Sequence, residues 1–131
     1  PDSQNFHSLV LNNQRDNVIK INCGLGRESS FLSINRPDMK NTGMHNMSNL
    51  PGIIPVLPLD SFNFPKIDLL QLDVEGYELN VIEGARETIK RCKPVITCER
   101  ARMVLNLIPT LESLGYKLVD DSVMDSIFIS S

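Results

Sequence analysis

The sequence predicts an α/β fold in which helices pack on a mostly parallel sheet. Strand-like and helix-like segments alternate along most of the chain, as they do where parallel strands are joined by right-handed crossovers. The apolar run 67–72 is too continuous for a half-exposed strand, which predicts a strand buried on both faces of the sheet. An amphipathic helical pattern follows directly. We therefore place the other elements around this strand.

The composition is that of an ordinary globular protein, with 41% hydrophobic and 22% charged residues among 131. A net charge of -3 and the lack of any Lys or Arg run argue against a nucleic-acid partner. No apolar stretch could span a bilayer and no signal-peptide pattern opens the sequence, so we expect no membrane partner and a cytoplasmic protein. Cys23, Cys92 and Cys98 lack metal-ligand spacing and are expected to be reduced thiols.

The beginning of the chain is expected to form a helix and then a strand. Residues 1–13 carry apolar side chains at helical spacing, and residues 17–22 alternate as a strand does. This strand should end in the segment Cys23-Gly24-Leu25-Gly26. Its two glycines are compatible with a turn or with a phosphate-binding loop. The turn is favoured because no third glycine or lysine follows.

Residues 30–60 are expected to form a β insertion and a loop. A strand is predicted at 30–34, and a polar loop without periodicity follows at 35–51. Long loops in compact domains are often functional, so the polar groups of residues 41–46 either reach a ligand or belong to a surface loop without a role. Residues 53–59 are extended but interrupted by two prolines, which confines them to a sheet edge.

The second half of the chain supplies the remaining elements. The order of strand, helix, strand and helix is clear from the periodicity, and Gly115 is placed to end the last helix. The final two strands are separated only by a polar turn, which predicts an antiparallel hairpin. The expected elements are a helical turn at 60–62, a helix at 79–92, a buried strand at 95–99, a helix at 103–114 and hairpin strands at 116–119 and 126–129.

Carboxylates gather where the two buried strands end. Asp73, Glu75 and Glu78 follow the strand 67–72, and Glu99 ends the next strand. Open α/β sheets bind ligands at the carboxyl ends of their strands, so we expect a hollow there that Asp73, Glu75 and Glu99 share. Acidic residues at such junctions also stabilise helix N-termini, but one carboxylate would suffice for that. The clustering therefore favours a functional role.

Several segments together match the pattern of one protein family. Its main motif, Lys-x-Asp-x-Glu-Gly-x-Glu followed by a Glu-Gly-Ala step, has counterparts in Gln71-Leu72-Asp73-Val74-Glu75-Gly76-Tyr77-Glu78 and Glu83-Gly84-Ala85. Leu57-Pro58-Leu59-Asp60-Ser61-Phe62 matches the preceding segment, Pro94-Val95-Ile96-Thr97-Cys98-Glu99 the next strand, and Cys23-Gly24-Leu25 a small-residue turn. In these segments the chain resembles the FkbM family of S-adenosylmethionine-dependent methyltransferases.

The resemblance implies a fold and an activity. The fold is a Rossmann-like class I methyltransferase sheet with strand order 3-2-1-4-5-7-6, mostly parallel and closed by the antiparallel hairpin. The activity is O-methylation of a sugar or another small hydroxyl-bearing molecule, with S-adenosylmethionine as cofactor. Asp73, Glu75 and Glu99 would then be catalytic, since a carboxylate can take the acceptor's proton. Cys23, Gly24, Leu25 and Asp73 would contact the cofactor.

The sequence departs from the family pattern in two places. Gln71 stands where the family has lysine, and the glycine-rich cofactor loop and the acidic residue that precede these segments in the family have no counterpart here. Residues 1–131 are therefore expected to be a single, partial methyltransferase-like domain truncated at its N-terminus. A missing N-terminal segment or a second chain would complete the sheet, and residues 17–22 would pair with the insertion or with the central strand.

Other interpretations of this chain stay open, namely an inactive module, a metal site and a hydrolase. Without the glycine-rich loop, the chain could be a catalytically inactive module with a structural or interaction role. The carboxylates also have the oxygen ligands that a divalent metal prefers, although we predict no metal site because no further ligand can be named. A metal-dependent hydrolase ranks last, since no nucleophile or histidine ligand accompanies the carboxylates.

Overall fold

The computed structural model describes residues 3–35, 46–122 and 124–131. The helices and strands in these residues are α1 (Ser3–Asn12), β1 (Gly24–Leu25), β2 (Ser30–Asn35), β3 (Asn46–Pro51), β4 (Ile54–Leu57), the 3-10 helix η2 (Leu59–Phe62), β5 (Leu69–Leu72), α2 (Glu78–Glu83), α3 (Arg86–Cys92), β6 (Val95–Glu99), the 3-10 helix η3 (Ala101–Met103), α4 (Leu107–Ser113), β7 (Tyr116–Asp121) and β8 (Asp125–Ser130). None of these helices combines the length and apolar character needed to cross a bilayer.

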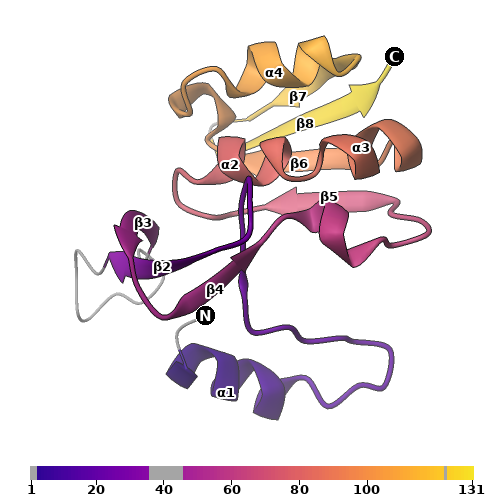
Figure 1. Ribbon diagram of the computed structural model, residues 1–131. Coiled ribbons are helices and arrows are strands. Elements are labelled where there is room, and N and C mark those ends of the chain that lie inside the picture. Colours follow the sequence, from indigo (N-terminus) through magenta and orange to yellow (C-terminus); the bar gives the residue numbers. More distant parts are fainter. Residues whose placement is uncertain (1–2, 36–45, 123) are drawn as a thin grey trace.

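The strands form two four-stranded sheets (Figure 1). The main sheet has the order β5-β6-β8-β7, and the insertion sheet has the order β1-β4-β2-β3. In the main sheet, β5 and β6 are parallel, and β8 runs antiparallel to both β6 and β7. The predicted α/β fold and its C-terminal antiparallel hairpin are therefore confirmed.

The prediction of a mostly parallel sheet is wrong for the described residues. Only the pairs β1–β4 and β5–β6 are parallel, and the other four pairings are antiparallel. A parallel pair needs a crossover connection. In the main sheet the segment between β5 and β6, which contains α2 and α3, supplies one. The short link between β7 and β8 permits only an antiparallel hairpin.

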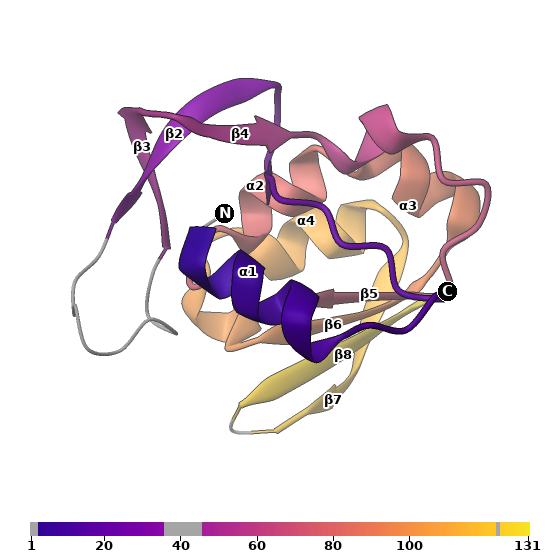
Figure 2. The same ribbon diagram turned by 90° about the horizontal axis from the view of Figure 1, so that it is seen from below.

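The hydrophobic core lies between the main sheet and the helices α2, α3 and α4, which cover one of its faces (Figures 1 and 2). Each strand and helix of this layer contributes inward-facing side chains. The buried cluster consists of Leu59, Leu70, Leu72, Val81, Ile82, Ala85, Ile89, Ile96, Cys98, Ala101, Leu107, Leu111, Tyr116 and Phe128. Its position fixes β5 and β6, and with them the strand ends that carry the carboxylates.

The second face of the main sheet is largely uncovered. Leu70 and Leu72 of β5 are buried, but Leu69 is 55% exposed, so the prediction of a strand buried on both faces is wrong. Helix α1 lies beyond the free edge of β5 (Figure 1), and its Leu9 and Leu11 remain 46% and 55% exposed. Because nothing in the described residues seals this face, β5 alternates between buried and exposed side chains.

The predicted strand at 17–22 is also wrong. These residues have no regular structure, and Ile19 is 82% exposed. A β-branched run forms a strand only where a neighbour supplies ladder hydrogen bonds and burial, and no described strand does so here. The chain pairs only in the next residues, where β1 lies parallel to β4 of the insertion. Residues 24 and 25 are thus a short strand rather than the predicted turn.

Strand β4 lies inside the insertion sheet, between β1 and β2, and not at the predicted edge. The amide of Gly26 donates to the Leu57 carbonyl, so the backbone groups of Leu57 and Pro55 face β1. Strand β1 begins only at Gly24, opposite Val56. The missing N–H of Pro55 therefore falls beyond the end of β1, where no ladder bond is lost.

The polar loop predicted at 35–51 is partly wrong, because β3 occupies its last six residues and pairs with β2. The Ser33 hydroxyl donates to the Pro51 carbonyl across this pair, at 2.8 Å. The candidate ligand contacts at 41–45 lie outside the described residues. The strand predicted at 30–34 and the helical turn at 60–62 are confirmed as β2 and η2.

The helix predicted at 79–92 is divided at Gly84 and Ala85 into α2 and α3. A side chain on Gly84 would place its Cβ 1.9 Å from the Gly26 carbonyl oxygen, so the glycine permits two backbone segments to touch. The Gly84 carbonyl accepts the Asp60 amide at 3.0 Å. The helix predicted at 103–114 starts later, at Leu107, because Pro109 is tolerated only in a first turn.

Candidate active site at the ends of β5 and β6

A tight turn connects β5 to α2. The Tyr77 amide donates to the Val74 carbonyl at 3.3 Å, and the two central residues, Glu75 and Gly76, have φ of 51° and 92°. Two positive φ values in succession are typical of a type I′ turn. Gly76 adopts this conformation freely, whereas the left-handed conformation costs a residue such as Glu75 roughly 1 to 2 kcal/mol.

The turn brings three carboxylates from two strands together. Leu72 and Cys98 are register partners in the parallel pair β5–β6, so Asp73 and Glu99 leave the sheet side by side. Asp73, Glu75 and Glu99 each place one carboxylate oxygen within 4.8 Å of the others. The expected meeting of these side chains is thus present, while their catalytic role stays a prediction.

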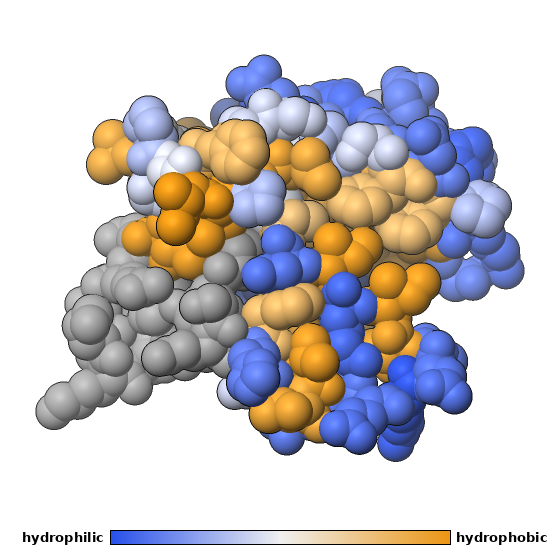
Figure 3. Space-filling model, turned by 60° about the horizontal axis from the view of Figure 1, so that its bottom comes forward, coloured by the Kyte–Doolittle hydropathy of each residue, from blue (hydrophilic) through white to orange (hydrophobic). Residues whose placement is uncertain are grey.

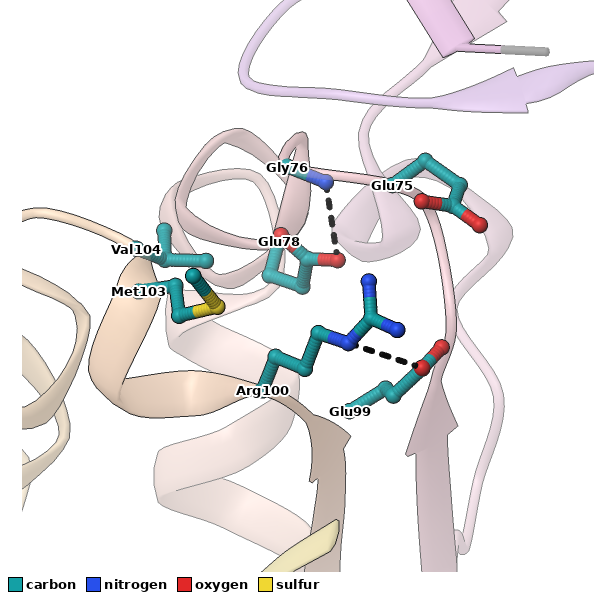
Figure 4. A pocket seen from close by; sticks show the side chains of 7 residues that line it. All are labelled: Glu75, Gly76, Glu78, Glu99, Arg100, Met103 and Val104. Carbon is teal, nitrogen blue, oxygen red and sulfur yellow. Dashed lines mark hydrogen bonds and ion pairs between the residues drawn. The ribbon is translucent and has the colours of Figure 1, made fainter. Parts of the chain in front are cut away.

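The closeness of these groups changes the acidity of Glu99. The pKa of Glu99 is raised, first by a hydrogen bond with Asp73, which requires a proton on one of the two carboxyl groups, and then by desolvation and the charge of Asp73. Arg100 opposes this shift, with its Nε 3.4 Å from a Glu99 carboxylate oxygen (Figure 4). The pair Asp73–Glu99 is therefore suited to holding and releasing a proton.

A pocket of about 170 Å³ opens beside these carboxylates. Its wall is acidic on one side and apolar on the other (Figure 4). The lining residues are Glu75, Gly76, Glu78, Glu99, Arg100, Met103 and Val104. Small-molecule sites usually enclose roughly 300 to 1,000 Å³, so this pocket is smaller than a typical one.

Glu78 is the buried member of this group, with 2% of its surface exposed. One of its oxygens, Oε1, accepts the amides of Val74 and Gly76 at 3.3 and 3.1 Å. The other, Oε2, is buried without a partner among the described residues. The sequence places Glu78 in the motif, but its burial could not be foreseen from the pattern.

The pocket residues Arg100, Met103 and Val104 were also not predicted as site residues. Arg100 follows the strand-ending Glu99 directly, and its position after a strand end was a signal that could have identified it. Its left-handed backbone, with φ of 47°, turns the chain into η3, which carries Met103 and leads to Val104. No sequence signal points to these two apolar residues.

The predicted cofactor contacts lie mostly apart from the carboxylates. Asp73 is among them, but Gly24 and Leu25 belong to β1, and Leu25 packs against the core. The glycines are explained by packing, since a Cβ on Gly24 or Gly26 would lie 3.2 or 2.6 Å from a Val56 methyl group. A cofactor role for Cys23, Gly24 and Leu25 stays a prediction.

The three carboxylate oxygens also have a spacing that a metal ion could use. Their oxygen chemistry suits a hard divalent cation. Exposed acidic groups gather without a metal as well, and Arg100 already pairs with Glu99. We therefore assign no metal to this site.

Comparisons with known proteins identify the family. The sequence model of the methyltransferase FkbM domain matches residues 1–118. The methyltransferase FkbM from Methylobacillus flagellatus KT has a similar crystal structure, with a TM-score of 0.58 and 19% sequence identity over 98% of this chain. The chain spans about a third of that protein, covering 34% of its length. No curated protein matches the sequence. The chain belongs to the methyltransferase FkbM domain family.

Proposed function

We propose that this chain is part of an S-adenosylmethionine-dependent O-methyltransferase that methylates a hydroxyl of a sugar or another small molecule. The observation that carries the proposal is the meeting of Asp73, Glu75 and Glu99 beside a pocket at the strand ends. In such a reaction the cofactor would supply the methyl group, and a base of the protein would take the proton of the acceptor hydroxyl. The pair Asp73–Glu99 is our candidate for that base.

The described residues fit the acceptor side of the reaction better than the cofactor. The spaces beside Gly24 and Gly26 are filled by Val56, so these glycines form no cradle. The pocket is also too small to enclose both reactants. We therefore infer that most cofactor contacts come from residues other than those described.

The free edge of β5 supports the proposal of an incomplete Rossmann-like class I sheet. The observed order β5-β6-β8-β7 agrees with the last four positions of the order 3-2-1-4-5-7-6 that the resemblance implies. In that order β5 would have a further neighbour on its free edge. We propose that an N-terminal segment or a second chain supplies it, which agrees with the greater length of the similar crystal structure.

The state of the cysteines supports a proposal about the cellular location. Cys23, Cys92 and Cys98 are all free in the structure. Free thiols are typical of reducing compartments. We therefore propose that the protein works in the cytoplasm.

The rival function is that of an inactive methyltransferase-fold module with a structural or interaction role. The small pocket favours it, since a complete site is not formed by the described residues. The two proposals differ in whether the carboxylates act on a bound acceptor.

Isothermal titration with S-adenosylmethionine and radiolabel transfer to a panel of methyl glycosides test the proposal. Both use the 131-residue chain alone and within any longer product of its gene. We expect the complete protein to bind the cofactor and to methylate a glycoside. Asp73→Asn and Glu99→Gln should each lower turnover by about 100-fold, in the range of lost general-base catalysis. The exposed Glu112→Gln serves as control. If neither the 131-residue chain nor a longer product binds the cofactor, the proposed enzyme function is wrong and the inactive module is the better interpretation.

A further inference from the structure

Glu78 holds the turn that carries the candidate catalytic carboxylates. It is the first residue of α2, and its side chain reaches back over the turn (Figure 4). A single oxygen, Oε1, accepts the amides of both Val74 and Gly76. These two amides flank Glu75, so one side chain fixes the backbone on both sides of a site residue.

Stability alone does not account for a carboxylate in this position. Glu78 is almost completely buried, and its Oε2 has no hydrogen-bond partner among the described residues. A buried polar atom without a partner costs free energy, and native proteins keep few of them. Such local violations concentrate at functional sites. The half-satisfied carboxylate therefore points to a role in the neighbouring site.

The conformation of the turn shows what that role would be. Glu75 has a φ of 51°, a backbone conformation that L-residues rarely adopt unless their surroundings impose it. Asp73 lies directly before the first clamped amide. If the clamp is lost, Glu75 can relax to negative φ, and both carboxylates then swing away from Glu99.

We propose that Glu78 is the positioning residue of this site, which holds Asp73 and Glu75 against Glu99 by clamping the amides of Val74 and Gly76. The catalytic meaning of this role rests on the proposed methyl transfer. The geometric part of the proposal, that Glu78 keeps the three carboxylates together, does not depend on methyl transfer.

Two substitutions separate the clamp from the charge. Glu78→Met keeps the length of the side chain but has no acceptor, whereas Glu78→Gln keeps one acceptor oxygen for both amides. Carbon-detected NMR titration reports the pKa of Glu99, which Asp73 raises in the intact site. We expect this pKa to fall toward its ordinary value in Glu78→Met and to stay raised in Glu78→Gln. A merely structural role would not produce this difference between the two variants.

Turnover gives the second readout, with Glu83→Gln on the same helix as a control, because Glu83 pairs with Arg86 and not with the turn. Glu78→Met should lower kcat by about 100-fold with little change in KM, as expected for misplaced catalytic groups. Glu78→Gln should recover most of this loss. If no form of the protein transfers methyl groups, the proposed function fails, while the Glu99 titration still decides the positioning role.

An unchanged Glu99 pKa in Glu78→Met would overturn the proposal. Should that variant not fold, Glu78→Asp replaces it, since its carboxylate is one methylene too short to reach both amides. The wild-type protein also gives a direct test. Coupling across the hydrogen bond from the Gly76 amide nitrogen to the Glu78 carboxyl carbon must be detectable, and its absence would equally refute the clamp.

Discussion

Cys98 lies in the core directly beneath the carboxylates and is almost fully buried. Its pKa is raised to about 12, first by burial and then by the negative charges of Glu78, Asp125, Asp73 and Glu99. The thiolate is the reactive form of cysteine, so this thiol is protected both sterically and electrostatically. A nucleophilic role for Cys98 is therefore inconsistent with its surroundings.

We expect iodoacetamide at pH 8 to leave Cys98 unmodified in the native protein. Cys23 and Cys92 are only partly buried and should be alkylated first. Peptide mass spectrometry before and after unfolding in urea checks the order of labelling. Native labelling of Cys98 as fast as that of Cys92 would show that the core beneath the carboxylates opens readily.

Gly84 and Gly115 are glycines for two different reasons. At Gly84 φ is -84°, which suits any residue, but a Cβ would clash with the Gly26 carbonyl. At Gly115 φ is +84° and the space around the missing side chain is open. Gly84→Ala should destabilise the fold by about 2 to 3 kcal/mol through overpacking, and Gly115→Ala by roughly 1 kcal/mol through backbone strain.

Urea unfolding of the two variants measures these changes. Each acts as the other's control, because one isolates steric contact and the other backbone conformation. Equal effects of the two substitutions would mean that the backbone segments at Gly26 and Gly84 can move apart without cost.

Among the elements, α3 is stabilised from a distant part of the chain. Its N-cap residue, Ala85, has no side-chain acceptor. The carboxylate of Asp60, in η2, accepts the amides of Glu87 and Thr88 at 3.1 and 2.8 Å instead. This contact joins η2, which precedes β5, to α3, which follows α2. The segment that contains β5, the turn and α2 is therefore held at both of its ends.

Asp60→Ala should lower the free energy of unfolding by about 1 to 3 kcal/mol, as for other hydrogen bonds to charged groups. Chemical denaturation followed by circular dichroism provides the measurement. Asp68→Ala is the matched control, because the Asp68 carboxylate forms an ion pair with the exposed Lys66. The unfolding midpoint of this control variant should not change. A wild-type midpoint for Asp60→Ala would show that α3 needs no cap.

Elements defined by their own periodicity could be predicted from the sequence, and elements defined by their neighbours could not. Helix α1 and the hairpin β7–β8 follow local patterns and were found. The strand predicted at 17–22 failed because its apolar alternation has no partner, and β4 was misplaced because only the short extent of β1 makes Pro55 tolerable inside a sheet.

The candidate site shows the same division. The meeting of Asp73 and Glu99 follows from two parallel strands that end at one edge, which the sequence pattern indicates. The contributions of Glu78 and Arg100 depend on left-handed residues at 75 and 100. Gly76 hints at the first of these turns, but no residue type announces that a glutamate or an arginine will adopt such a conformation.

At the scale of the whole molecule, one side of the main sheet is unusually apolar. Leu69 and Val95 are register partners on β5 and β6, and both are exposed. Figure 3, turned so that the bottom of Figure 1 comes forward, shows several apolar side chains exposed on the underside of the molecule. Exposed apolar patches are typical of interaction sites, so we predict that this face takes part in association.

The 131-residue chain alone should therefore bind the dye ANS and associate at micromolar concentration. Leu69→Lys should reduce the association, since a charge on an edge strand opposes pairing, without lowering stability, because the side chain is already half exposed. Leu105→Lys, at an exposed site before α4, is the control. A monomer in light scattering, together with no rise in ANS fluorescence, would contradict the prediction.

The unpaired side of β5 has a practical consequence. Among the described residues its backbone groups have no partner strand, and an edge of this kind can accept the added strand of a designed peptide. Such a peptide, carrying a fluorophore, would serve as a specific label for this edge of the sheet.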